Sequence, residues 1–395
     1  MLSLRQLFLL NTAQTSCTPR LIEVEKAEGI YIYDSAGNKY MDLVSGFAVS
    51  NIGHRHPDVI KAITEQMEKY LHVTVYGEYV QAPQVKFATK ITSVLPESLQ
   101  SVYFTNSGAE ATEGAMKLSK RFTGKSEIIA CKNSYHGSTQ GALSLMGNES
   151  YKQKFRPLLP DVRFIEFGNL VDLERITSAT AAVFIETIQG EAGVQVAELN
   201  YYKALRDKCT STGSLLVLDE IQTGFGRTGK LFAFEHFDIE PDILLIAKGM
   251  GGGMPLGAFV SSNEIMSALK DNPILGHITT FGGHPLSCAA GLASLNVILN
   301  ERLMDSVAEK EKLFKKLLHH EKIKEVRGKG LMLSIQLDTF ERVEAVSKLC
   351  EKKGVMIDWF LHCETALRIA PPLTITFEEI EHACAIIVES IGKAA

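Results

Sequence analysis

Residues 214–255 decide the fold, and they read SLLVLDEIQTGFGRTGKLFAFEHFDIEPDILLIAKGMGGGMP. The stretch contains two short apolar runs, Ser214–Leu218 and Asp242–Ala247. Each run has the length of a strand, and an unbroken apolar run is typical of a strand covered on both faces in a parallel sheet. An acidic pair that begins at Asp219 follows the first run, and Lys248 follows the second. Both predicted strands therefore carry polar groups at their carboxyl ends, where open α/β sheets bind ligands.

The same alternation of apolar runs and helical stretches continues on both sides of this segment. Helical stretches such as Glu110–Phe122 and Tyr201–Thr212 lie between several of the runs. Buried strands that alternate with helices predict an α/β fold with a mostly parallel, doubly wound sheet. The further strands that we assign to this sheet are Ser101–Thr105, Glu127–Cys131, Ala181–Ile185 and Gly257–Ser261.

The two ends of the chain have a different pattern, which predicts a smaller α+β domain. After Pro285 a long helical pattern runs from Leu286 to about His319, and strand-like stretches follow at residues 330–337 and 366–370. The predicted parts are an N-terminal segment of the small domain (1–52), a large domain (53–290) and a C-terminal small domain (291–395).

Composition bounds the partners of the chain. With 395 residues, 45% hydrophobic and 22% charged, it has the profile of an ordinary globular protein. A net charge of −5 without a basic stripe argues against nucleic acid, and no apolar stretch approaches the roughly 20 residues of a membrane helix. The run Leu7–Leu10 is too short for a signal sequence, and the seven scattered cysteines predict free thiols. We expect a small-molecule partner and a cytoplasmic location.

Ser107, Gly108 and Ala109 lie where a predicted strand turns into a helix. Unpaired N–H groups and the positive end of the helix dipole make such a turn a natural phosphate cradle. An ordinary capped helix explains the same residues, because Ser107 with Glu110 three residues later fits a capping box. The pattern alone leaves both interpretations open.

Asp219 and Lys248 offer a buried acid and a buried amine. The carboxylate needs a cationic partner, since burying an isolated charge is too costly; a pyridinium nitrogen would suit it, although a turn cap also fits. Burial lowers the pKa of a lysine and leaves its amine nucleophilic, as Schiff-base formation requires. The glycines that follow Lys248 let the backbone pass close to a ligand.

Three other motifs suggest different chemistry. Gly224–Gly229 matches the GxGxxG dinucleotide fingerprint, but it does not follow a strand directly and no strong helical run begins at it. Residues 124–126, Gly-Lys-Ser, lack the leading glycine of a P-loop. His54 and His56 could ligate a metal, yet their stretch reads more readily as a turn and has no third ligand. We expect no metal.

Taken together, these stretches resemble the class III, or omega, aminotransferases of the fold-type I superfamily, which use pyridoxal 5'-phosphate (PLP). The most specific part runs from Leu218 to Gly229 and continues through Ala247-Lys248-Gly-Met-Gly-Gly-Gly. Ser107-Gly-Ala-Glu-Ala and Thr280-Phe-Gly-Gly add to the resemblance, which covers nearly the whole chain. It implies a seven-stranded, mostly parallel sheet and a homodimer with shared active sites.

The resemblance also implies roles for the motif residues. Lys248 resembles the lysine that holds PLP as a Schiff base, and Asp219 is similar to the carboxylate that keeps the ring nitrogen protonated. Gln222 resembles the residue at the phenolic oxygen, and Tyr135 resembles the aromatic residue stacked on the ring. The other cofactor-binding residues that it implies are Ser107, Gly108, Ala109, His136, Glu186 and Thr280, the last reaching the phosphate from the neighbouring subunit.

Within the family the chain is most similar to acetylornithine and ornithine aminotransferases, which implies ping-pong transfer from such an omega-amino donor to a keto acid. Arg368 resembles the arginine that binds a substrate carboxylate. Glu191 resembles the acid that pairs with this arginine when no carboxylate is present, and Phe47 is similar to a residue that lines the pocket. Ser138 departs from the pattern, because an arginine for a second carboxylate usually stands there and a serine cannot replace it. Arg163 is a candidate substitute.

Several alternatives stay open at this point. The donor could be 4-aminobutyrate, lysine or a diamine with pyruvate as acceptor, or the reaction could be decarboxylation or an aminomutase reaction on the same fold. Gly224–Gly229 keeps a nicotinamide-dependent oxidoreductase open. A protein that retains PLP without turnover is the last alternative, and intact Lys248, Asp219 and Gln222 argue against it.

Overall fold

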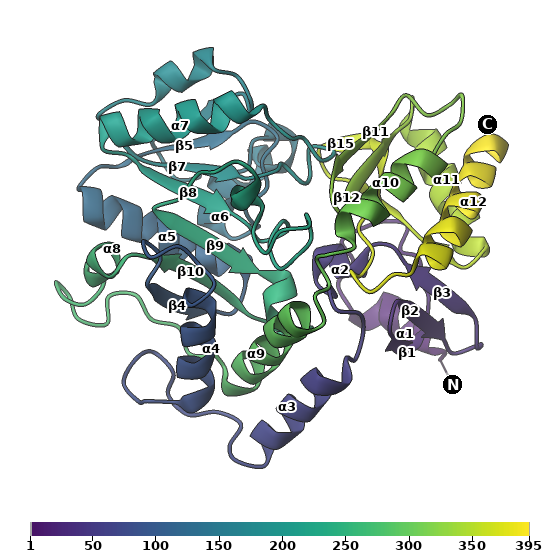
Figure 1. Ribbon diagram of the computed structural model, residues 1–395, viewed down its shortest axis with the longest axis horizontal. Helices are drawn as coiled ribbons and strands as arrows, with labels where there is room; N and C mark the ends of the chain where they lie inside the picture. The colour runs from purple at the N-terminus through teal and green to yellow at the C-terminus, as the bar shows by residue number, and fades with distance from the viewer. Residues whose placement is uncertain (1, 395) are drawn as a thin grey trace.

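The structure, a computed structural model, describes residues 2–394, and its largest sheet has seven strands (Figure 1). Neighbouring strands from β9 to β6 are parallel, and β10 is antiparallel to both of its neighbours, which confirms the prediction of a mostly parallel sheet. The strand order is β4 (Ser101–Thr105), β10 (Gly257–Ser261), β9 (Ile243–Ala247), β8 (Leu215–Asp219), β7 (Thr180–Glu186), β5 (Glu127–Cys131) and β6 (Val162–Ile165).

Strand β9 shows why a central strand of this sheet is apolar along its whole length. Ile243 and Leu245 pack into the hydrophobic cluster on one face of the sheet, and Leu244 and Ile246 pack into the cluster on the other. Successive side chains of a strand point to opposite faces, so a strand covered on both sides needs an apolar residue at every position. The helices of this large lobe are α3 (Pro57–Met67), α4 (Ala82–Thr92), α5 (Gly108–Thr123), α6 (Gln140–Ser144), α7 (Leu199–Thr212), α8 (Asn263–Ser267) and α9 (Pro285–Asn300).

Both ends of the chain meet in a second core, the small lobe. Ile30, Met41 and Leu43 share one buried cluster with residues that follow Val307. One sheet has the order β1 (Val24–Glu28), β2 (Tyr31–Asp34), β3 (Lys39–Asp42) and β13 (Val355–Met356); the other has β11 (Glu325–Lys329), β12 (Met332–Gln336), β15 (Cys363–Ile369) and β14 (Asp358–Phe360). The helices are α2 (Ser45–Ala48), α10 (Val307–Leu317), α11 (Phe340–Lys352) and α12 (Phe377–Lys393). The domain boundaries after residues 52 and 290 stay predictions.

The long helical pattern from Leu286 to about His319 forms two helices, α9 and α10, with a turn at residues 301–306 between them. The chain leaves the helical path at Arg302, whose φ is +53°. Leu303, the next residue, packs against the cores of both lobes. The helix therefore ends where the chain crosses between lobes. No helix within residues 2–394 combines the length and the apolarity that a bilayer crossing demands.

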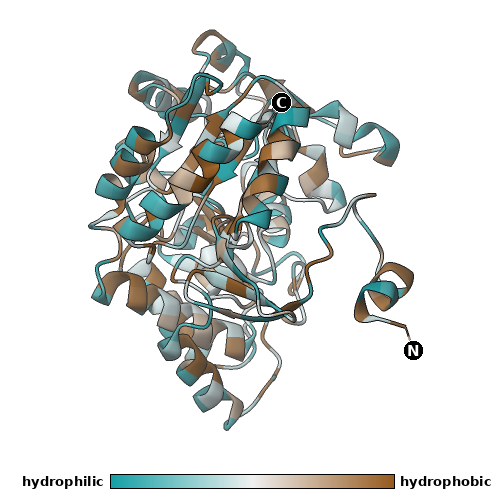
Figure 2. Cartoon of the chain, turned by 90° about the vertical axis from the view of Figure 1, so that its right-hand side faces the viewer, coloured by the Kyte–Doolittle hydropathy of each residue, from teal (hydrophilic) through white to brown (hydrophobic). Residues whose placement is uncertain are grey.

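Helix α1 (Leu4–Asn11) is a second element that the sequence analysis missed. Ser3 and Gln6 form a capping box at its start, which explains why so short a segment is helical. Figure 2 shows this helix standing apart from the body of the chain, and none of its residues is buried. Its apolar residues Leu4 and Leu10 are 66% and 68% exposed. An uncovered apolar surface of this kind is typical of an interaction site.

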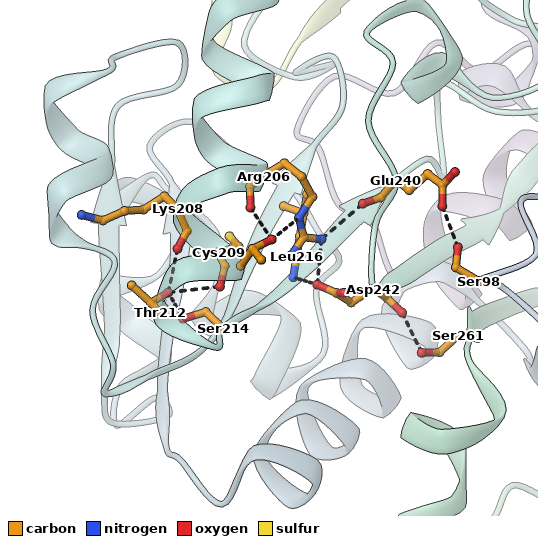
Figure 3. Close-up of polar contacts among 11 residues, drawn as sticks. Ser98, Arg206, Lys208, Cys209, Thr212, Ser214, Leu216, Glu240, Asp242 and Ser261 are labelled. Atoms are coloured by element: carbon orange, nitrogen blue, oxygen red, sulfur yellow. Dashed lines mark hydrogen bonds and ion pairs between the residues drawn. The ribbon is translucent and has the colours of Figure 1, made fainter.

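Polar contacts fix β9 at its amino end, opposite to the Lys248 end (Figure 3). The Oδ2 atom of Asp242 accepts hydrogen bonds from Arg206 Nη1 at 2.8 Å and from Leu216 N at 2.6 Å. The hydroxyl of Ser261 donates to the Asp242 carbonyl at 2.6 Å. Asp242 thus joins α7, β8 and β10 to the start of β9.

The seven cysteines are free thiols, as predicted, and five of them are buried. The buried thiols are divided between the cores of the two lobes. Cys131, Cys209 and Cys288 lie in the large lobe, Cys350 and Cys384 lie in the small lobe, Cys17 is exposed and Cys363 is partly exposed.

Candidate active site

The carboxyl ends of β7, β8 and β9 meet at one cavity of about 760 Å³. Parallel strands bring their carboxyl ends to the same edge of the sheet, so residues far apart in the sequence become neighbours there. The predicted cofactor-binding residues on its wall are Ser107, Gly108, Ala109, Tyr135, His136, Glu186, Asp219, Gln222 and Lys248.

Lys248 follows β9 directly and has a left-handed backbone with φ of +49°. Such a conformation is uncommon outside glycine and occurs often at functional sites. Burial lowers the pKa of its amine to about 8, and the charges of Glu191 and Asp219 only partly oppose this effect. A large fraction of the amine is therefore neutral, and nucleophilic, near pH 8.

Asp219 ends β8 and has partners for both carboxylate oxygens. Oδ2 lies 2.7 Å from His136 Nδ1, and Oδ1 accepts a hydrogen bond from Ile221 N at 2.9 Å. Burial lowers the pKa of His136, but its hydrogen bond to Asp219 and the charge of that carboxylate outweigh burial and raise the pKa overall. The pair offers a fixed, buried negative group for a cationic ligand nitrogen. Glu220, the other member of the acidic pair, instead caps the turn at Ala233 and Phe234.

The N-terminus of α5 opens onto the cavity at Ser107, Gly108 and Ala109. The Ser107 hydroxyl accepts a hydrogen bond from Glu110 N at 3.2 Å, so the capping interaction is present. The first N–H groups of a helix have no intrahelical carbonyl and remain available to a ligand. A Cβ atom on Gly108 would lie 2.7 Å from Ile221 Cδ1, so a larger residue would have to displace the Ile221 side chain.

Glu186 joins two loops on the cavity wall. Its carboxylate accepts hydrogen bonds from Tyr135 N at 2.7 Å and from Gly190 N at 2.6 Å. Burial, together with the charge of Asp219, raises its pKa to about 7. The carboxyl group therefore holds the aromatic loop at Tyr135 against the loop that carries Glu191.

Ser138 gives this wall a neutral character. Its hydroxyl lies 3.1 Å from the hydroxyl of Tyr135, and both residues line the cavity. The neighbouring Thr139 hydroxyl donates to Glu113 at 2.6 Å. The prediction that Arg163 could substitute for an arginine at this wall is wrong. Arg163 lies near the amino end of β6, its side chain is 65% exposed, and it pairs with Glu127.

Glu191 and Arg368 form a buried ion pair beside the cavity, with 2.6 Å between Oε2 and Nη2. Gln222 connects this pair to the cavity wall, because its amide donates to Glu191 at 2.9 Å and accepts from Arg368 at 3.3 Å. Burial raises the pKa of Glu191, but Arg368 outweighs burial and lowers it to about 2. The rings of Phe47 and Phe360 lie 5.1 and 4.4 Å from the guanidinium carbon.

Other candidates lie outside the cavity. Thr280 is exposed, so its predicted role in a neighbouring subunit stays a prediction. The Gly224–Gly229 loop opens no helix, which makes the dinucleotide interpretation wrong. His54 contacts Asp42 at 2.9 Å, and His56 caps α3.

Ile221 and Met254 contribute apolar side chains to the cavity wall and were not predicted from the sequence. Ile221 lies in the turn after β8, where the period of two of a strand no longer applies, so strand periodicity does not predict its direction. Glu113 was not predicted either. Its carboxylate holds the loop after Ser138 by accepting hydrogen bonds from the N–H groups of Gly141 and Ala142.

Known proteins resemble the chain along almost its whole length. A family model described as Aminotransferase class-III matches residues 12–391. The acetylornithine aminotransferase of Methanocaldococcus jannaschii is 42% identical over 368 residues and 90% of each chain. The acetylornithine aminotransferase of Elizabethkingia anophelis superimposes with a TM-score of 0.85 at 32% identity over 98% of each chain. An ornithine aminotransferase of Toxoplasma gondii, crystallised with partial occupancy of PLP at its active site, gives 0.90 at 29% identity over 98% of this chain and 94% of its own.

Proposed function

The chain belongs to the class III aminotransferases, and from this membership we propose that it transfers an amino group from an ornithine- or acetylornithine-like donor to a keto acid with PLP as cofactor. The observation that carries the proposal is the cavity where Lys248, Asp219 and the N-terminus of α5 converge. These groups offer a reactive amine, a buried anion and a phosphate cradle within one cavity.

PLP fits the residues that are present. Ser107, Gly108 and Ala109 would hold its phosphate, since the helix start supplies N–H donors and a positive dipole end. Asp219 would face the ring nitrogen, and His136 fixes that carboxylate from behind. When bound, the cofactor carries the amino group between the two substrates and accepts the electrons released at the substrate carbon.

The residues of the chain then supply acid–base chemistry and orientation. The Lys248 amine, whose pKa burial lowers to about 8, would accept a proton from the substrate carbon and then donate it to the cofactor, which returns the amine to its neutral form. The negative charge of Asp219 would favour the protonated form of the ring nitrogen. Tyr135 lines the cavity and would limit the space over the ring.

Arg368 would bind the carboxylate of a keto acid through its guanidinium fork. Its present partner Glu191 comes from a loop of the large lobe and must move aside before a carboxylate can take its place. A substrate that presents no carboxylate at this position leaves the pair intact. One pocket can therefore accept both an omega-amine and a keto acid.

A homodimer with shared sites is part of the proposal. Thr280 lies in a loop with the exposed apolar residues Ile274, Ile278 and Phe281, between 49% and 73% exposed. A second subunit that covers this surface would bring Thr280 toward a phosphate site. Size-exclusion chromatography with light scattering measures the mass; a monomer at assay concentrations would refute this part. The cytoplasmic location stays a prediction, supported by the free thiols.

The visible spectrum of the PLP-loaded protein tests the function. Acetylornithine, ornithine, 4-aminobutyrate and alanine would be added one at a time, and we expect the cofactor absorbance to change with an ornithine-like donor and to return with a keto acid. Lys248→Ala should abolish turnover. A protein that takes up no PLP, or whose Lys248→Ala variant still transaminates at more than a residual rate, would overturn the proposal.

A further inference from the structure

Arg227 is the largest fully buried side chain of the described residues, and it forms no ion pair within residues 2–394. Burial lowers the pKa of its guanidinium to about 9, although the charge of Asp42 opposes this effect. Nη1 donates to the carbonyl oxygens of Leu331, at 3.0 Å, and of Pro371. Nη2 donates to Asn51 Oδ1. Burying a cation without an anion costs free energy. The fold accepts this cost and surrounds the guanidinium with neutral acceptors, which indicates that Arg227 holds the segments that carry them.

Asn51 connects this guanidinium to the reacting end of the site. Its Nδ2 donates to the Phe225 carbonyl at 2.9 Å, and a Cβ atom on Gly249 would lie 2.7 Å from the same nitrogen. The Asn51 amide therefore rests directly against Gly249, the residue that follows Lys248. A side chain at position 249 would have to displace this amide.

The other acceptors of Arg227 belong to the carboxylate-binding end. Pro371 lies three residues beyond Arg368 on the same segment, and Leu331 precedes β12, in which Ser334 pairs with Arg368. The Asn51 carbonyl also accepts a hydrogen bond from Leu373 N at 2.7 Å. One pair of side chains thus spans from the backbone beside Lys248 to the backbone beside Arg368.

We propose that Asn51 and Arg227 form a positioning pair that fixes the spacing between the Lys248 amine and the Arg368 guanidinium, and that, among substrates whose carboxylate Arg368 binds, this spacing selects by the number of carbons between amine and carboxylate. The inference rests on the proposed function, because it requires both groups to act on one substrate. Neither side chain lines the cavity, so the pair acts through the backbone that it holds.

The test uses the PLP-loaded protein and four donors in which one to four carbons separate amine from carboxylate: alanine, β-alanine, 4-aminobutyrate and 5-aminopentanoate. Butylamine, which has no carboxylate, is the internal reference. Stopped-flow absorbance gives the rate and the apparent dissociation constant for each donor. In Arg227→Lys the donors lie on one nitrogen, so they cannot span the acceptors on three separate segments that Nη1 and Nη2 reach in the wild type. For each donor the rate is divided by the dissociation constant. We expect the ratio of this quotient between the best and the worst donor, which is the spread of the series, to fall about tenfold in the variant. The butylamine values should stay within about twofold of the wild type.

Asn51→Ser provides a second variant that keeps a small polar group, and it should shrink the spread in the same way. Arg206→Lys is the matched control, because Arg206 also donates to a carbonyl but lies at the opposite edge of the sheet (Figure 3). The thermal shift given by butanoate, a carboxylate that cannot react, is read alongside and should fall in both positioning variants. An unchanged spread, or an equal loss with butylamine, overturns the inference. If the unmodified protein does not transaminate, the proposed function is wrong, and this outcome differs from an unchanged spread.

Discussion

Replacing Glu191 by glutamine removes the anion from a buried ion pair and keeps the shape of the side chain. The folded protein lowers the pKa of this carboxyl group from 4.5 to about 2, which corresponds to about 3 kcal/mol of interaction with its ionised form. Breaking a buried pair by removing one partner typically costs about 3–5 kcal/mol, because the other charge stays buried. We therefore expect Glu191→Gln to lower the free energy of unfolding by about 3 kcal/mol at pH 7.

The pH dependence of this difference has a definite sign. The pKa of Glu191 is lower in the folded state than in the unfolded state, so its contribution is complete above about pH 4.5. It is lost as the pH falls towards about 2, when the folded state also takes up the proton. About half of the difference between wild type and variant should remain near pH 3. The two proteins should become equally stable at lower pH.

Urea unfolding of the PLP-loaded protein, followed by circular dichroism, measures these free energies. Glu149→Gln is the matched control, because Glu149 pairs with Arg156 at 2.7 Å on the surface and should contribute no more than about 1 kcal/mol. Butanoate at a hundred times its dissociation constant should restore about 2.7 kcal/mol to Glu191→Gln by supplying the missing anion to Arg368. A loss below about 1 kcal/mol, or a larger butanoate effect on wild type, would refute the reasoning.

Three further outcomes test individual groups of the site. The rate of PLP uptake by cofactor-free protein, followed by absorbance, should rise with pH through about 8 rather than through the range of a free lysine, since burial lowers the pKa of Lys248; a rise only above pH 10 would contradict this. Asp219→Asn should lower kcat by about 100-fold or more, and the pKa of His136, read from its ring resonances by NMR, should fall because only the charge of Glu186 then opposes burial; an unchanged His136 titration would exclude the pairing. Gly137→Ala should weaken PLP binding by roughly tenfold in a fluorescence titration, because φ is +127° and the new Cβ would lie 2.6 Å from Ala109 Cβ; wild-type affinity would show that the turn can adapt.

The central sheet and its chemistry could be predicted because their signals are local. The central strands β8 and β9 are apolar runs, and Asp219 and Lys248 stand directly at their ends; β6, which contains Arg163, lacks this pattern and was not predicted. The rule that ligands bind at the carboxyl ends of parallel strands then brings these residues together without any knowledge of distances. Arg163 failed by the same rule, because it stands near the start of its strand and not at the end.

Features that depend on tertiary packing could not be predicted. Residues 301–304 are good helix formers, yet the chain turns at Arg302 because Leu303 must reach both cores. The contact between Asn51 and Arg227 joins residues 176 positions apart, and no period or motif links them. The Arg368–Glu191 pair, 177 positions apart, became visible only through family resemblance.

The buried thiols can report separately on the unfolding of the two lobes, because each core contains its own cysteines. Cys131, Cys209 and Cys288 report on the core of the large lobe, and Cys350 and Cys384 report on the core of the small lobe. Pulsed alkylation in denaturant, read by mass spectrometry of peptides, would label each group when its own core opens. Equal labelling rates would mean that both lobes unfold in one cooperative step, whereas earlier labelling of Cys350 and Cys384 would mean that the small lobe can open while the sheet stays closed.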